Sequence, residues 1–149
     1  MLGLALTILV FVVIWVMSFL LHELCHIIEA MRQGISTGYI RVWKFGILPS
    51  FIAEVDEEIP NKFMFALSGG LYSGLILAPL AIISNIFGYI PFAFAFTATS
   101  VTNLAYSLFE SKYLFSMDRR KYMILHYLIY VACVLLVFAA YFKRIMLWI

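Results

Sequence analysis

Long stretches without a charged side chain are the feature that most restricts how this chain can fold. Residues 1–21, 63–109 and 122–142 contain no Asp, Glu, Lys or Arg. A helix needs about 20 apolar residues to cross the hydrocarbon core of a bilayer, because each residue adds about 1.5 Å. The second stretch is long enough for two such helices. Asn85, Gly88 and Pro91 predict the turn between them. We therefore expect four spans, near residues 2–30, 62–87, 91–112 and 122–142.

The composition agrees with a membrane protein. Hydrophobic residues make up 65% of the 149 residues and charged residues only 12%, which is far more apolar than a soluble domain. The two cysteines, Cys25 and Cys133, both lie in apolar segments, so no disulfide framework is expected. A net charge of +2 without a basic cluster argues against a nucleic-acid partner. The expected surroundings are a lipid bilayer, and the length indicates a single domain over residues 1–149.

The segment between the first two helices has a different pattern. Over residues 39–45, Tyr39, Arg41, Trp43 and Phe45 alternate with Ile40, Val42 and Lys44 in a short strand pattern, and a second strand-like run covers 50–55. The Gly46–Pro49 turn would join them into a hairpin. The predicted fold class is an all-α membrane protein, with about four transmembrane helices and a short β-like hairpin between helices 1 and 2.

The basic residues predict the orientation in the membrane. The 33–62 loop with its flank carries four of them and the 112–121 connection another four, whereas the C-terminal end carries two. By the positive-inside rule both basic loops are cytoplasmic and both chain ends lie outside. We expect a multi-pass protein, in the plasma membrane of a prokaryote.

A His-Glu-x-x-His motif lies near the end of the first predicted helix. On a helix, His22 and His26 share one face, so they can bind one zinc ion together. Glu23 lies beside them and can act as the catalytic general base on an activated water. Ionisable groups inside a bilayer are costly and are therefore most often functional. The motif predicts a zinc metalloprotease site within the membrane.

Catalytic zinc has three protein ligands in most enzymes, so a third ligand is expected. Polar residues of the third helix, Ser100, Asn103, Ser107 and Glu110, form one stripe at helical spacing. Glu110 is the leading candidate for the third ligand, and Asn103 is a candidate catalytic residue that would stabilise the oxyanion. Asp118, beyond the helix end, is the alternative third ligand. His126 can also reach the site, but a hydrogen-bonded core histidine is the simpler interpretation. The glycines at 69, 70 and 74 are expected to allow close helix packing.

At these positions the chain resembles the site-2 protease family of intramembrane zinc metalloproteases. The order of the motifs resembles that family as well, since a β-like insert follows His22-Glu23-x-x-His26. Residues 65–73 then resemble the alanine-glycine-proline motif of the family, and Asn103-Leu104 resembles its asparagine-leucine segment. The similarity covers about residues 10–120, so that a three-helix protease-like core over about 1–120 would be followed by an extra helix at about 121–149.

This resemblance implies a zinc endopeptidase that cleaves transmembrane or membrane-anchored substrates. The chain also departs from the family pattern, with Cys25, Gly70 and Ser73 where the family has Gly, Pro and Asn. The Leu-Asp-Gly motif, which supplies the family's third ligand, is absent as such, and Asp118 in Phe-Ser-Met-Asp is its nearest counterpart. The alternative is a catalytically inactive homologue that binds zinc or membrane segments. A haem-binding bundle is disfavoured, because His22 and His26 lie on one helix.

Overall fold

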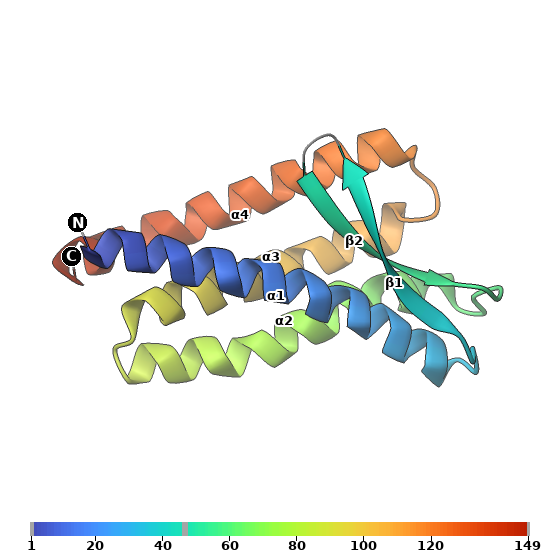
Figure 1. Ribbon diagram of the computed structural model, residues 1–149, viewed down its shortest axis with the longest axis horizontal. Coiled ribbons are helices and arrows are strands. Elements are labelled where there is room, and N and C mark those ends of the chain that lie inside the picture. The colour runs from blue at the N-terminus through green and yellow to red at the C-terminus, as the bar shows by residue number, and fades with distance from the viewer. Residues whose placement is uncertain (1, 46–47, 149) are drawn as a thin grey trace.

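Four long helices and one two-stranded hairpin make up the fold (Figure 1). The computed structural model describes residues 2–45 and 48–148. Its elements are α1 (Leu2–Arg32), β1 (Gly38–Phe45), β2 (Leu48–Val55), α2 (Lys62–Ile86), α3 (Ile90–Tyr113) and α4 (Arg119–Trp148). The predicted fold class is therefore confirmed, and the first three helices begin and end within a few residues of the predicted bounds.

All four helices are long and apolar enough to cross a membrane. Their outward faces carry large apolar side chains with high exposure, such as Leu9 at 60% on α1 and Leu136 at 72% on α4. In water such a surface would be unfavourable, whereas lipid chains are as apolar as these side chains. The polar residues are instead gathered inside the bundle, between α1, α2 and α3.

The helices alternate in direction along the chain. α1 and α3 run the same way, α2 and α4 run the opposite way, and both chain ends lie at one end of the bundle (Figure 1). The hairpin lies at the other end and crosses over α1 (Figure 1). The two loops that carry the basic residues are therefore at the same end of the molecule, as the orientation prediction requires.

The hairpin is antiparallel, with a register that runs from Gly38 opposite Val55 to Phe45 opposite Leu48. The second strand begins two residues earlier than predicted, since Leu48 and Pro49 already belong to β2. The remaining two residues of the predicted turn, Gly46 and Ile47, lie outside the described residues.

Small residues bring α2 and α3 close together. A Cβ at Gly70 would lie against the carbonyl oxygen of Asn103 and 2.8 Å from the Cβ of Ser107. One turn on, a Cβ at Gly74 would lie 2.6 Å from Leu104, and the Ser100 hydroxyl donates to the Gly74 carbonyl at 2.9 Å. The packing predicted for Gly70 and Gly74 is present, and it fixes the depth of α3 relative to α2.

The end of α1 is held by a buried carboxylate. Glu29, only 1% exposed, accepts hydrogen bonds from Tyr72 of α2 at 3.1 Å and from Gln33 at 3.0 Å. Arg32 adds an ion pair at 3.1 Å. Because these donors compensate the buried charge, Glu29 joins α1 to α2 and has a structural explanation.

At the opposite end of the bundle, α4 continues to Trp148, beyond the predicted span that ends at residue 142 and close to the end of the extra helix predicted at about 121–149. Arg144 and Tyr141 both donate to Oδ1 of Asn85, at 2.7 and 2.8 Å. This shared acceptor on α2 lies next to the α2–α3 turn. The C-terminal part of α4 is therefore part of the bundle and packs with Ile145, which is 2% exposed.

We expect Gly70→Ala to destabilise the fold, because the new methyl group has no free space between α2 and α3. Overpacking of this kind costs about 1–3 kcal/mol. The measurement is the thermal unfolding midpoint in detergent. Ala105→Val, at an exposed position of α3, is the matched control and should leave the midpoint unchanged. Equal midpoints for Gly70→Ala and the wild type would contradict the close packing.

Candidate metal centre

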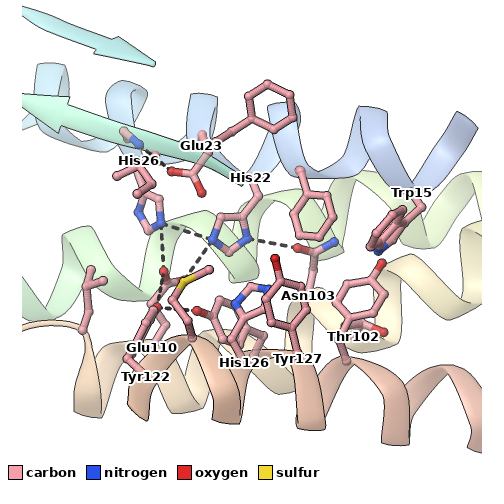
Figure 2. Close-up of a pocket in the computed structure, with 18 of the residues that line it drawn as sticks. Trp15, His22, Glu23, His26, Thr102, Asn103, Glu110, Tyr122, His126 and Tyr127 are labelled. Carbon is pink, nitrogen blue, oxygen red and sulfur yellow. Dashed lines mark hydrogen bonds and ion pairs between the residues drawn. The ribbon is translucent and has the colours of Figure 1, made fainter. Parts of the chain in front are cut away.

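His22 and His26 lie one above the other on the buried face of α1. Their side chains are 5% and 3% exposed, and their Nε2 atoms approach to 3.2 Å (Figure 2). This arrangement follows from the helix itself, since positions four apart stand on the same face. The two rings therefore point their outer nitrogens at one place inside the bundle.

The inner nitrogens of both rings are occupied by acceptors. Nδ1 of His26 lies 2.7 Å from the Phe65 carbonyl, which can only accept, so Nδ1 carries the proton. Nδ1 of His22 lies 3.0 Å from Oδ1 of Asn103. The amide of Asn103 is oriented by its own donation to the Thr99 carbonyl at 2.8 Å, which identifies Oδ1 as the atom facing His22. In their neutral forms both rings consequently present a lone pair at Nε2, as metal-binding histidines do.

Glu110 of α3 completes the group. Its Oε2 lies 3.0 Å from Nε2 of His22, and its Oε1 lies 3.3 Å from Nε2 of His26. The side chain is buried, and Oε2 has no hydrogen-bond partner among the described residues. A carboxylate oxygen and two nitrogen lone pairs facing one another repel, so a cation or additional protons must compensate them.

The spacing of these atoms fits a zinc ion. Zinc–nitrogen and zinc–oxygen bonds of about 2.0–2.2 Å in a tetrahedron separate neighbouring ligand atoms by about 3.4 Å. The separations of 3.2 Å between the two histidines, and of 3.0 and 3.3 Å from them to Glu110, are close to this value. His22, His26 and Glu110 are therefore close enough to share one metal ion, and His22, Glu23 and His26 form an overlapping group that could also hold one.

Gly69 of α2 leaves room at this point. A Cβ at Gly69 would lie against Nε2 of His26 and 2.7 Å from Nε2 of His22. Sequence analysis assigned Gly69 to helix packing together with Gly70. The structure separates the two glycines, because only Gly70 faces α3, whereas Gly69 faces the histidine rings.

Glu23 lies on the other side of the histidine pair, next to the hairpin (Figure 2). One carboxylate oxygen of Glu23, one ring nitrogen of His22 and one ring nitrogen of His26 all lie within 4.8 Å of one another. The three side chains can therefore share a metal ion. Oε2 of Glu23 accepts a hydrogen bond from the backbone N–H of Ala53 at 2.7 Å. This bond ties the carboxylate to β2 and leaves Oε1 directed to the site.

Asn103 is placed beside His22, where its amide is bonded on both sides. Because Oδ1 is opposite His22 and Nδ2 donates to Thr99, only one amide hydrogen remains for another acceptor. The geometry favours a positioning role for Asn103, in which it orients the His22 ring. The oxyanion role expected from the sequence stays a prediction. The polar stripe also divides, since Ser100 and Ser107 face α2 while Asn103 and Glu110 face α1.

Asp118, the alternative third ligand, lies apart from this group. It is exposed, and its Oδ1 accepts from the backbone N–H groups of Arg120 and Lys121 at 3.1 and 3.2 Å. These contacts are those of a residue that caps the start of α4. The structure therefore brings together His22, Glu23, His26, Asn103 and Glu110, and leaves Asp118 at the bundle surface.

Two tyrosines that sequence analysis did not select hold Glu110. Tyr122 of α4 donates to its Oε1 at 3.0 Å, and Tyr106 of α3 donates to the Tyr122 hydroxyl. Tyr106 is three residues from Asn103, so helical spacing would have indicated it. Tyr122 carries no such signal, because its position depends on how α4 folds back onto α3.

A cavity of about 220 Å³ opens beside these groups and is lined by side chains of α1, α3, α4 and β2. His126 also lines it, with a buried Nδ1 that has no hydrogen-bond partner within residues 2–45 and 48–148. The sequence predicts that His126 is a hydrogen-bonded core histidine. The structure differs at Nδ1, which is buried and unpaired among the described residues. In comparisons with known proteins, no family model, no curated protein and no solved structure matched this chain.

We expect zinc to be lost from His22→Ala and from Glu110→Ala but to remain in Asp118→Ala. The reason is that the first two remove atoms from the converging group, whereas Asp118 only caps α4. The measurement is metal content per protein by mass spectrometry after detergent purification. Retention of zinc by Glu110→Ala together with loss from Asp118→Ala would reverse this assignment.

Gly69→Ala should also abolish zinc binding, although it removes no ligand. The added methyl group would occupy the space at the two Nε2 atoms. Leu75→Ala, at a 55% exposed position on the same helix, is the control and should keep its metal. Normal zinc content in Gly69→Ala, with an unchanged unfolding midpoint, would show that the metal does not sit beside α2.

Proposed function

We propose that this protein is an intramembrane zinc metalloendopeptidase that hydrolyses peptide bonds of transmembrane or membrane-anchored substrates. The observation that carries the proposal is the convergence of His22, His26 and Glu110 within 3.0–3.3 Å. It lies beside a further carboxylate, Glu23, inside a bundle of apolar helices. A metal ion would compensate the facing acceptor atoms of this group, as the surrounding donors compensate the buried carboxylate of Glu29.

The two carboxylates are suited to different tasks. Glu110 is in direct contact with both histidines, and Tyr122 fixes one of its oxygens, as expected for a ligand. Glu23 is outside this contact, and its Oε1 is available at the cavity. A general base must take a proton from the attacking water and must not bind the metal itself. It therefore has to lie one water molecule away from the ion, as Glu23 would.

A bound zinc ion would supply Lewis acidity, activating a water molecule and polarising the scissile carbonyl. Oε1 of Glu23 would accept the proton of the attacking water and return it to the leaving amine. The bond from Ala53 to Oε2 holds the Glu23 carboxylate in place during both transfers. Asn103 and the Phe65 carbonyl keep the two rings oriented, which preserves the site between turnovers.

The resemblance to site-2 proteases supports the same proposal, although no family model matched. The third ligand proposed here, Glu110, comes from within α3 rather than from a Leu-Asp-Gly motif. The alternative is a catalytically inactive homologue that binds zinc or membrane segments through the same residues. Metal content does not distinguish this homologue from a peptidase, because both would bind zinc, whereas a cleavage assay does. A haem site is not supported, since the two Nε2 atoms converge at 3.2 Å and leave no space for a porphyrin between them.

Glu23→Gln should keep zinc and lose peptidase activity by at least about 100-fold, because the amide cannot accept the proton. The assay is release of a tag from a pool of single-span reporter fusions in proteoliposomes, with metal content measured in parallel. Glu58→Gln, an exposed position near the hairpin, is the charge-matched control and should cleave normally. Undiminished cleavage by Glu23→Gln would end the catalytic proposal, and zinc-loaded wild type without any cleavage would favour the inactive homologue.

A further inference from the structure

The cavity continues from the metal centre along α1 towards the chain ends, between α1 and α4. Its walls in this part, which we call the α1–α4 lobe, are Trp15 and Phe19 on one side and His126 and Tyr130 on the other. Trp15, Phe19, His22 and His26 form one stripe on α1, because their spacing of seven and four residues returns to the same face. The lobe is therefore continuous with the proposed catalytic site (Figure 2).

α1 and α4 meet here through aromatic rings. The ring centroids of Trp15 and Tyr130 are 5.7 Å apart, and those of Phe19 and His126 are 6.1 Å apart. α1 packs closely on α2 and α3 instead. Side chains that meet in this way can move apart by rotation, without breaking the packing of the helix backbones.

The lobe contains polar atoms that nothing in the described structure satisfies. Nε1 of Trp15 and Nδ1 of His126 are both buried and lack a hydrogen-bond partner. The Tyr130 hydroxyl is close enough to Ser18 to interact with it, so it is not counted among the unsatisfied atoms of the lobe. A buried donor without a partner costs about 1–3 kcal/mol and persists where a ligand satisfies it.

We propose that the α1–α4 lobe binds an extended stretch of substrate backbone next to the scissile bond. Carbonyl oxygens of this stretch would accept hydrogen bonds from the Trp15 indole and from the His126 ring. This inference rests on the proposed peptidase function. It adds a substrate-binding subsite to which the fourth helix contributes one wall.

The dimensions select an unwound chain as the occupant. A helix is about 10 Å in diameter with its side chains, which is too wide for a cavity of about 220 Å³. The metal centre and the lobe together enclose about 220 Å³, and a cavity of about 150 Å³ already holds benzene, so a peptide group with its side chain fits once the aromatic walls rotate apart. Trp15 lies about 10 Å along α1 from His22, the length of about three extended residues.

The chemistry of an unwound segment matches the lobe. A transmembrane helix that opens for cleavage exposes carbonyl and amide groups, which have no water to bond inside a bilayer. Trp15 offers a donor that cannot accept, so it selects a carbonyl oxygen. The aromatic walls suit the apolar side chains that such a segment carries.

Two hydroxamates test the inference on the zinc-loaded protein in detergent. A hydroxamate group chelates the metal, so acetohydroxamate reports on the metal centre alone. N-acetyl-dileucyl hydroxamate extends a peptide from one side of the chelating group, and a malonyl hydroxamate of dileucine amide extends one from the other. The quantity measured is the affinity of each peptide compound relative to acetohydroxamate, by isothermal titration calorimetry.

For the wild type, one of the two peptide compounds should bind more tightly than acetohydroxamate. Trp15→Phe and His126→Phe keep a ring but remove the polar atom, and each should reduce this advantage about 3- to 10-fold. Acetohydroxamate affinity and zinc content should stay unchanged, which shows that the variants are folded. Trp148→Phe removes an indole at the other end of α4 and is the matched control.

An unchanged advantage in both variants would overturn the subsite while leaving the metal centre intact. Absence of acetohydroxamate binding to the wild type would instead overturn the metal centre, and the subsite with it.

Discussion

The arrangement of this molecule depends on one electrostatic requirement, the compensation of three buried acceptor groups that face one another. His22 and His26 direct their Nε2 atoms at the carboxylate of Glu110, and all three side chains are at most 5% exposed. In a low-dielectric interior such groups are unstable unless a cation or protons join them. The neighbouring residues increase this requirement. Asn103 and the Phe65 carbonyl accept the hydrogen bonds of the Nδ1 atoms, so the Nε2 atoms of the neutral rings carry no proton.

The surrounding helices are packed so that this group can form. Gly70 and Gly74 bring α3 against α2, which sets the depth of Glu110, and Gly69 leaves the space in front of the histidines. α4 adds Tyr122, whose hydroxyl holds Glu110 from the opposite side. Each of the three other helices therefore contributes at least one residue to the site, whose centre lies on α1.

A second feature is the connection between the hairpin and Glu23. The backbone N–H of Ala53 donates to this carboxylate, so β2 is joined to the proposed catalytic base rather than only covering it. An amide donor stabilises the ionised form of a carboxylate, which is the form that accepts a proton. The hairpin thus positions the side chain of the proposed catalytic base.

Much of the fold was predictable, because it depends on local patterns. The uncharged stretches define the helices by length alone, and the strand-like runs over 39–45 and 50–55 define the hairpin. Errors fell where distant contacts decide the outcome. β2 begins at Leu48 rather than at Ser50 because its partner strand extends that far, and Arg144 ties α4 to Asn85 on α2, a contact that chain order does not reveal.

The sequence by itself determined that His22 and His26 share a face, since helical spacing is a property of the backbone. It also identified Glu110 and Asn103 as polar residues of one stripe, but it left Glu110 and Asp118 as alternatives for the third ligand. Only the tertiary structure placed Glu110 at 3.0 Å from His22 and Asp118 at the start of α4. It alone showed that Gly69 differs from Gly70, and that Trp15 and His126 face one cavity. These relations depend on the depth and rotation of each helix against its neighbours, and packing between distant segments sets both.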